Sequence, residues 1–261
     1  MLAKSRLKYL CSLKQKKYRR EYGTFLTEGS KLCEEALKSD FCVETIFICP
    51  AAFHGSKQTT FVQYAANKQA DIIEISANEL KKLSTTVHSQ GIIGLVHLKQ
   101  YQLHQLHLRE KALILVLEKL MDPGNLGTII RTADWFGIDA ILLGKETVEL
   151  HNAKVVRSTM GSLFHLPILT NVDLPASLNL LKKKGFQTYA ATSHGDLRFD
   201  QLPFANRRIL ILGNESMGIS SELMRLVDEK ITIPGADRTD SLNVAIAAGI
   251  LLYQLTQPCF S

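Results

Sequence analysis

The sequence predicts an α/β fold in two parts, joined by a short polar linker. Apolar runs short enough to be strands alternate with segments of helical periodicity along the 261 residues. In the second half several of these runs are almost continuously hydrophobic, which is typical of parallel strands buried on both faces. The content of 46% hydrophobic and 21% charged residues is ordinary for a globular chain.

Residues 1–98 are expected to form a small α/β domain. Residues 4–20 read as one basic helix with leucines on one side, and residues 43–48 alternate as a strand does. The other elements expected here are helices at 28–39, 58–68 and 77–83 and strands at 71–75 and 91–98.

Residues 99–110 are polar and rich in glutamine and histidine, and we expect them to form a linker. His104 and His107 have a spacing compatible with a metal site, but no cysteine lies nearby to complete one. Solvated linker histidines are the simpler interpretation, and we expect no metal. The cysteines of the chain form no C-x-x-C pair, so neither a zinc site nor a disulfide framework is expected.

Residues 111–261 are expected to form a mostly parallel sheet with helices on both faces. The last helix is apolar nearly all round from Val244 to Leu255, so it must be buried in the core or in an oligomer interface. The expected strands are 113–117, 140–143, 166–169, 186–191, 209–212 and 231–233.

The basic residues are concentrated at one end. Residues 1–20 hold eight basic side chains and no acidic one, although the whole chain carries a formal net charge of only +6. Such a segment attracts polyanions through phosphate neutralisation, or it is simply a solvated helix face. No apolar signal-peptide region and no apolar run long enough to cross a bilayer is present, which predicts a cytoplasmic protein with reduced thiols and no membrane contact.

Three segments each place a polar loop at the end of an expected strand, where parallel sheets bind ligands. In the first, Asp122-Pro123-Gly124 makes a turn and Asn125 stands at the expected N-cap, with Arg131 six residues on. The two residues act at a site above the sheet, or they are a capping residue and a surface arginine.

The second segment runs from the strand at 209–212 into Gly213, Asn214 and Glu215. Gly213 would let a ligand approach the backbone closely. Glu215 either takes part in catalysis or favours the start of the next helix through the helix dipole.

In the third segment a short strand ends at Ile233-Pro234, and a polar loop leads to Ser241, which can cap the last helix. No G-x-G-x-x-G follows a strand, and neither a phosphate-binding P-loop nor a G-x-S-x-G elbow occurs. A Rossmann dinucleotide site and an α/β-hydrolase are therefore not supported.

Taken in this order, the segments resemble the motifs of the SpoU (TrmH-like) branch of the SPOUT methyltransferases over about residues 112–257. The stretches 25–29 and 90–92 resemble the small substrate-binding domain of many SpoU enzymes, which is similar to RNA-binding ribosomal proteins. The residues that carry the catalytic resemblance are Asn125, Gly127 and Arg131, then Gly213, Glu215 and Gly218, then Ile233-Pro234 with Ser241 to Val244, and the segment 157–163 with Leu166-Pro167.

The resemblance implies a trefoil knot near the end of the second domain and a homodimer whose site is completed across the interface. It also implies transfer of a methyl group from S-adenosyl-L-methionine to a ribose 2′-hydroxyl of RNA. Ribosomal RNA of the large subunit is favoured over tRNA. A non-catalytic RNA-binding relative and a base or protein methyltransferase are the alternatives, and the ordered set of polar residues argues against both.

The same resemblance implies residue roles. Arg131 takes the catalytic position, and Asn125, Glu215, Ser241 and Asn243 supply hydrogen bonds around it. A guanidinium is effectively always charged, so orienting phosphate and ribose or stabilising the nascent alkoxide suits Arg131 better than acting as a base. The cofactor contacts are expected at Leu212, Gly213, Asn214, Ile233, Pro234 and Leu242.

Overall fold

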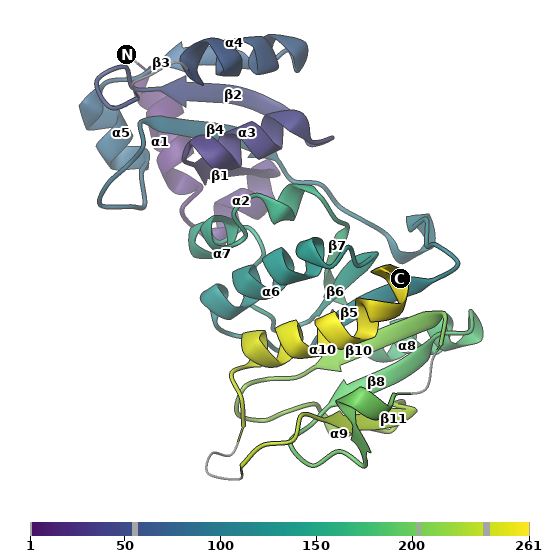
Figure 1. The fold of residues 1–261 in the computed structure, drawn as a ribbon. Coiled ribbons are helices and arrows are strands. Elements are labelled where there is room, and N and C mark those ends of the chain that lie inside the picture. The colour runs from purple at the N-terminus through teal and green to yellow at the C-terminus, as the bar shows by residue number, and fades with distance from the viewer. Residues whose placement is uncertain (1, 54–56, 203–204, 237–240, 261) are drawn as a thin grey trace. The chain divides into compact units, whose positions relative to one another are not determined.

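The protein was analysed as a computed structural model that describes residues 2–53, 57–202, 205–236 and 241–260, without the side chains of 57–60 and 258–260. Its contacts divide the chain into two compact units (Figure 1). The first consists of Met1–Lys99 and Glu149–His165, and the second of Gln100–Val148 and Leu166–Ser261. A short stretch from the second half of the sequence is thus part of the first unit.

The first unit is built on a four-stranded mixed sheet. β1 (Thr24–Glu28) and β2 (Val43–Ile48) run antiparallel to β4 (Ile92–His97) on its two sides, and β3 (Asp71–Glu74) runs parallel to β2 at the edge. β1 was not expected from the sequence; it is followed by Gly29, whose φ of +104° turns the chain into the next helix. The helices of this part are α1 (Lys4–Ser12), α2 (Lys16–Tyr22), α3 (Ser30–Lys38), α4 (Lys57–Asn67) and α5 (Ala77–Leu83).

The expected single helix over 4–20 is wrong, because the chain breaks between α1 and α2. Gln15 has extended backbone and precedes α2. Leu10 and Leu13 are 0% and 2% exposed and belong to a core cluster with strand residues. The break lets the Arg19 side chain turn inward, where its Nη1 donates to the carbonyl oxygens of Leu13 and Lys14 at 2.7 and 2.9 Å.

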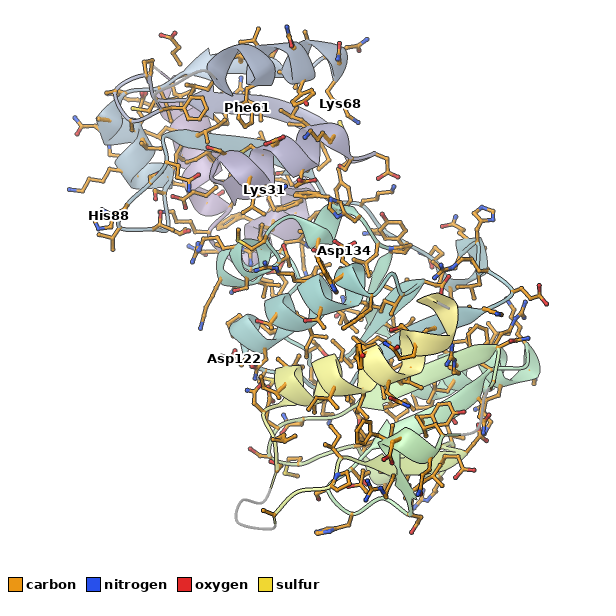
Figure 2. All side chains as sticks on the ribbon, viewed as in Figure 1. Lys31, Phe61, Lys68, His88, Asp122 and Asp134 are labelled. Atoms are coloured by element: carbon orange, nitrogen blue, oxygen red, sulfur yellow. The ribbon has the colours of Figure 1, made fainter. Side chains whose placement is uncertain are left out.

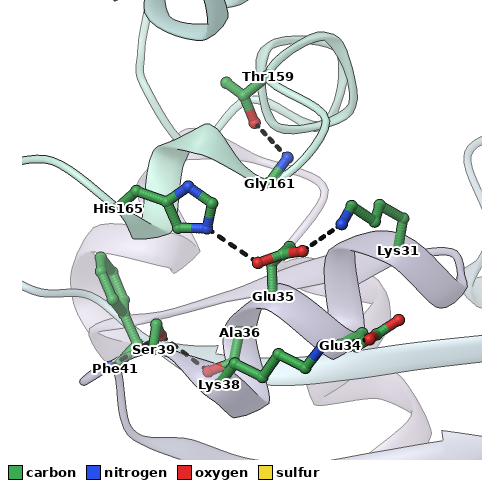
Figure 3. Close-up of polar contacts among 10 residues, drawn as sticks. All are labelled: Lys31, Glu34, Glu35, Ala36, Lys38, Ser39, Phe41, Thr159, Gly161 and His165. Carbon is green, nitrogen blue, oxygen red and sulfur yellow. Dashed lines mark hydrogen bonds and ion pairs between the residues drawn. The ribbon is translucent and has the colours of Figure 1, made fainter. Parts of the chain in front are cut away.

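The stretch 149–165 packs on this first sheet. It contains α7 (Ala153–Ser158) and the 3₁₀ turn η2 (Ser162–Phe164). Figure 3 shows His165 bonded through Nε2 to the Glu35 carboxylate of α3, at 2.9 Å. Phe164 packs edge-on against Phe41, with ring centroids 5.1 Å apart. A methyl group on Gly161, whose φ is +109°, would lie 2.5 Å from Glu35 Cγ, so the close approach of η2 to α3 requires glycine.

The second unit is a seven-stranded sheet in the order β7-β6-β5-β10-β8-β11-β9. Every pairing between neighbouring strands is parallel, which confirms the predicted mostly parallel sheet. The two-residue β9 at the edge was not expected. The strands are β5 (Ala112–Leu117), β6 (Ala140–Gly144), β7 (Ile168–Val172), β8 (Gln187–Ala191), β9 (Leu197–Arg198), β10 (Arg207–Leu212) and β11 (Glu229–Thr232).

Helices lie on both faces of this sheet, as predicted. Alternate residues of β5 and β10 pack against α8 (Leu174–Lys183) and α9 (Ser221–Met224) in one core cluster. The intervening strand residues point to the opposite face. There α6 (Pro123–Trp135) and α10 (Val244–Phe260) pack against each other (Figure 1). Two 3₁₀ turns, η1 (Leu103–Gln105) and η3 (Phe199–Gln201), complete the unit.

The last helix buries only one side within a single chain. Ala248, Leu251, Leu252 and Leu255 are at most 2% exposed, whereas Tyr253 is 55% exposed. Among the described helices none has the length and apolarity that a bilayer crossing requires.

The buried ion pair between Arg19 and Glu149 ties α2 to the stretch 149–165. The two side chains are only 5% and 14% exposed. Replacing Arg19 by methionine leaves the Glu149 carboxylate without its partner, so we expect the free energy of unfolding to fall by about 3 kcal/mol. Urea denaturation followed by circular dichroism measures it. The neighbouring, exposed Arg20→Met is the matched control and should change stability by less than about 0.5 kcal/mol; equal effects of the two substitutions would contradict a structural role of the pair.

Candidate active site

The site lies at the carboxyl edge of the second sheet. β10 pairs with β5 in register, Leu212 opposite Leu117, so the two strands end side by side. The loop before α6 and the loop after Leu212 therefore start from neighbouring points. This is the edge at which parallel sheets bind ligands.

The first loop enters α6 through an aspartate cap. Asp122, labelled in Figure 2, accepts a hydrogen bond from the backbone nitrogen of Asn125 at 2.7 Å, and Pro123 begins the helix. The prediction that Asn125 is the N-cap is wrong, because Asp122 takes that place. Asn125 stands inside the first turn, and its side-chain amide is left available for other partners.

A chain of two side-chain hydrogen bonds joins the three predicted segments. Asn243 Nδ2 donates to Asn125 Oδ1 at 3.1 Å, and Asn125 Nδ2 donates to Glu215 Oε1 at 3.1 Å. We call Asn243, Asn125 and Glu215 the amide relay. It brings together positions up to 118 residues apart. Asn125 accepts and donates at once, as a side-chain amide can.

Asn243 also begins the last helix. Its Oδ1 accepts hydrogen bonds from the backbone nitrogens of Ala245 and Ile246 at 2.9 and 3.3 Å. The expectation that Ser241 caps this helix is therefore wrong. Ser241 is exposed, and the polar loop 237–240 before it lies outside the described residues.

The loop after β10 is held by Asn214. Its Oδ1 accepts from the nitrogens of Ser216 and Met217, both at 2.9 Å, and its Nδ2 donates to the Lys119 carbonyl at 2.9 Å. A methyl group on Gly213 would lie 2.3 Å from backbone atoms of Gly218. The closure of the loop therefore requires glycine at this position.

Glu118 was missed by the sequence interpretation. It directly follows β5, is only 7% exposed, and accepts a hydrogen bond from the Ser220 nitrogen at 2.7 Å. Its position, a carboxylate immediately after a fully buried strand, could have identified Glu118 as a candidate from the sequence. Its role here is to fix the end of the loop that carries Glu215.

Within one protomer, the remaining predicted residues do not take part in the amide relay. Arg131 is exposed on α6 and has no hydrogen bond or ion pair among the residues that the structure describes. Six residues of α-helix rotate it by about 240° from Asn125, so the two side chains leave the helix in different directions. Leu212 is buried at the strand end, Ile233 is half-buried, and Pro234 and Leu242 are exposed.

The fold and the relay define an α/β protein of the SpoU type, because all three segments of that resemblance meet at one sheet edge. Residues 112–253 match the family model "SpoU rRNA Methylase family", and residues 4–94 match the "MRM3-like substrate binding domain". The chain belongs to the SpoU rRNA methylase family, which confirms the family resemblance.

Relatives match nearly the whole chain. It is 33% identical over 243 residues to 23S rRNA (guanosine(2553)-2′-O)-methyltransferase RlmP of Bacillus subtilis, covering 93% of this chain and 92% of that one. An AdoMet-bound rRNA methyltransferase from Sinorhizobium meliloti superposes with a TM-score of 0.87 at 29% identity, over 100% of this chain and 97% of that one. A TrmH-family RNA methyltransferase structure from Porphyromonas gingivalis gives 0.84 at 30% identity, over 98% of both chains.

Gly213 offers a test of the loop. In Gly213→Ala the added methyl group must displace the backbone at Gly218, so we expect a loss of about 1–3 kcal/mol in the free energy of unfolding. Gly249→Ala in α10 is the control: its methyl group would be 3.9 Å from Thr132 Cγ2, and alanine should stabilise the helix slightly. Urea titrations of both variants measure the difference, and an unperturbed Gly213→Ala would contradict the geometry of the loop.

Proposed function

We propose that the chain transfers a methyl group from S-adenosyl-L-methionine to a ribose 2′-hydroxyl of ribosomal RNA, in the large subunit. The observation that carries the proposal is the amide relay at the carboxyl edge of the parallel sheet. The printed name of the Bacillus subtilis relative, a 23S rRNA 2′-O-methyltransferase, supports both the reaction and the class of RNA. A tRNA substrate is the alternative outcome when methylated riboses are mapped.

The residues present fit the cofactor. Leu242 is 48% exposed and comes directly before Asn243, so apolar surface adjoins the amide relay. An amphipathic adenosine with a charged amino-acid tail needs both kinds of surface. Backbone at Leu212, Gly213, Asn214, Ile233, Pro234 and Leu242 would hold it. When bound, it supplies an electrophilic methyl group on a sulfonium.

The chain's own residues then align the hydroxyl and manage its charge. Alignment of the attacking oxygen with the methyl group is chiefly a proximity effect. The relay, with Ser241, would position the ribose through hydrogen bonds. Arg131 would bind the neighbouring phosphate with its planar fork of donors and stabilise the developing alkoxide.

We further propose a homodimer in which Arg131 acts in the partner's site. Trp135, at the end of the same helix, is 83% exposed, and Ile246 and Tyr253 on α10 are 56% and 55% exposed. Apolar side chains on two packed helices are typical of a covered interface. A second copy seated there would bury them, and Arg131 would lie at the rim of the contact.

Three finer points also remain proposals. The trefoil knot at the C-terminal end is supported by family membership. The division of the sequence into 1–98, 99–110 and 111–261 is supported by the extents of the two matched models, although residues 149–165 belong to the first compact unit. A cytoplasmic location is supported by the free thiols of Cys11, Cys33, Cys42 and Cys49.

Replacing Arg131 tests its role. We expect Arg131→Ala to bind S-adenosyl-L-methionine normally in calorimetry but to lose about a hundredfold or more in turnover, because charge stabilisation acts only in the transition state. Mixing it in equal amounts with Asn125→Ala should recover about a quarter of wild-type activity, since half the dimers then hold one complete site. Exposed Arg225→Ala is the control. Lost cofactor binding, or no recovery on mixing, would contradict this assignment.

The basic N-terminus is proposed to bind RNA phosphate, but only through part of its charge. Deleting residues 1–20 would remove buried Leu10, Leu13 and Arg19. Replacing exposed Lys8, Lys16, Lys17 and Arg20 by glutamine keeps the core. We expect the slope of log affinity for RNA against log salt to become shallower by up to about 3. The control replaces Lys183 and Lys230, which are exposed in the second unit; an unchanged slope in the quadruple variant would remove this segment from the RNA-binding surface.

A further inference from the structure

The first compact unit contains a cavity that the proposed methyl transfer does not use. It has a volume of about 100 Å³ and is bounded by residues 13–14 between α1 and α2, and by α2, β1, β4, α5, α7 and the residues just before α7. Its apolar lining includes Leu26, Leu83, Ile93 and Val156. Its volume is well below that of pockets for drug-sized ligands, about 300–1,000 Å³, so it suits one small group.

Polar groups with unused hydrogen-bonding capacity line the same cavity. Lys14 Nζ donates to the Ser84 carbonyl at 2.9 Å and keeps two further donors. Asn152 Oδ1 accepts from the Lys154 nitrogen at 2.9 Å, and its NH₂ group has no partner among the described residues. Arg157 donates through Nη1 to Thr85 Oγ1 and keeps its other guanidinium donors for a ligand.

His151 is the unusual member of this wall. Its ring packs on Phe25, with centroids 4.6 Å apart, and neither ring nitrogen has a hydrogen bond among the described residues. Burial, with a smaller contribution from Arg19, lowers the pKa of His151 to about 3. The imidazole is therefore neutral near pH 7, and one of its nitrogens is an acceptor.

We propose that this cavity binds one unpaired nucleobase of the RNA substrate, an inference that rests on the proposed function. A base has apolar faces, which match the apolar lining of the cavity, and a polar edge, which matches its polar lining. Its carbonyl oxygen or ring nitrogen would accept from Arg157 or Asn152. Its amino or imino N–H would donate to His151. Single-stranded RNA is generally read this way, by splayed-out bases that stack and bond along their edges.

A phosphate group fits the cavity less well. Burial alone would raise the pKa of Glu28, but hydrogen bonds from Ser84, Thr86 and Thr85 lower it, so this lining residue stays ionised. Arg19 is already neutralised by Glu149. An anion would meet Lys14 and Arg157, but it would also lie beside the ionised Glu28 carboxylate and against apolar side chains, which is costly.

The test compares RNA with and without bases on the full-length chain. The probes are fluorescent octamers of rA, rC, rG and rU and an abasic ribose-phosphate octamer, titrated by anisotropy. We expect at least one base-bearing octamer to bind about tenfold more tightly than the abasic one. His151→Phe keeps the ring on Phe25 but removes its nitrogens, and the preference should fall towards one. Because His151 is neutral, the salt dependence should not change.

Two further variants complete the design. Ala153→Leu narrows the cavity and gives an independent answer if His151→Phe does not fold, as judged by its melting temperature. His104→Phe, at an exposed position in 99–110, is the matched control and should keep the preference. Equal binding of all five octamers, or an unchanged preference in both cavity variants, would overturn the proposal. Equal weakening of base-bearing and abasic octamers in Arg157→Ala would assign Arg157 to phosphate and overturn its role as a donor to the base.

Methyl transfer by the wild-type chain is measured separately, by mass spectrometry of ribosomal RNA incubated with S-adenosyl-L-methionine. A chain that methylates RNA but shows no base preference refutes the cavity alone. A chain that prefers base-bearing octamers but transfers no methyl group refutes the proposed function and leaves the cavity standing.

Discussion

The site depends on the parallel pairing of β5 with β10. Because Leu117 and Leu212 are opposite each other, the two following loops start from neighbouring points at one edge. A slip of one residue would turn every side chain of β10 to the other face, and both faces are buried. The register is therefore set by the fit of particular side chains on the two faces rather than by a contrast of polar and apolar residues. The position of the amide relay follows from the core.

Given that register, the relay is selective about residue type. Asn125 must accept from Asn243 and donate to Glu215 at the same time. Aspartate would place a second carboxylate beside Glu215, and serine would be too short for both contacts. The Asn125 side chain can make both hydrogen bonds because Asp122, and not Asn125, caps α6. Asn243 caps α10 through its oxygen and joins the relay through its nitrogen, so one side chain sets both the helix start and the site.

The sequence was sufficient for elements whose burial is continuous and local. The central strands of the second unit were predicted to within about two residues, because a buried strand can be recognised from its own run of apolar residues without knowing which strands pair with it. The caps were misassigned because aspartate, asparagine and serine cap helices about equally well, and spacing alone does not choose among them. The break after α1 was missed because a contact that accompanies it, the pairing of Arg19 with Glu149, spans 130 residues.

The same long-range limit applies to the site. The motifs correctly predicted residues that lie together, such as Asn125 and Glu215, because each follows a strand whose end could be predicted. The motifs did not show that Arg131 points away from the relay. That direction follows from helical rotation only once Asn125 is known to lie inside the helix rather than at its cap. The stretch 149–165 was read with the second domain by chain order, yet its aromatic and charged side chains pack on the first sheet.

Burial also divides the basic N-terminus into groups with different tasks. Arg19 is 4% exposed and bound to Glu149, so its charge holds two segments together and is not available to a polyanion. Exposed lysines such as Lys16 and Lys17 can neutralise phosphates, but phosphate contacts position RNA without reading its sequence. Selectivity among RNAs must then come from groups that meet base edges. In the proposed cavity these are nitrogens of His151 and Asn152, which have no hydrogen-bond partner among the described residues. In this proposal net charge governs how strongly RNA is attracted, whereas uncharged side chains in the small cavity decide which nucleotide is accepted.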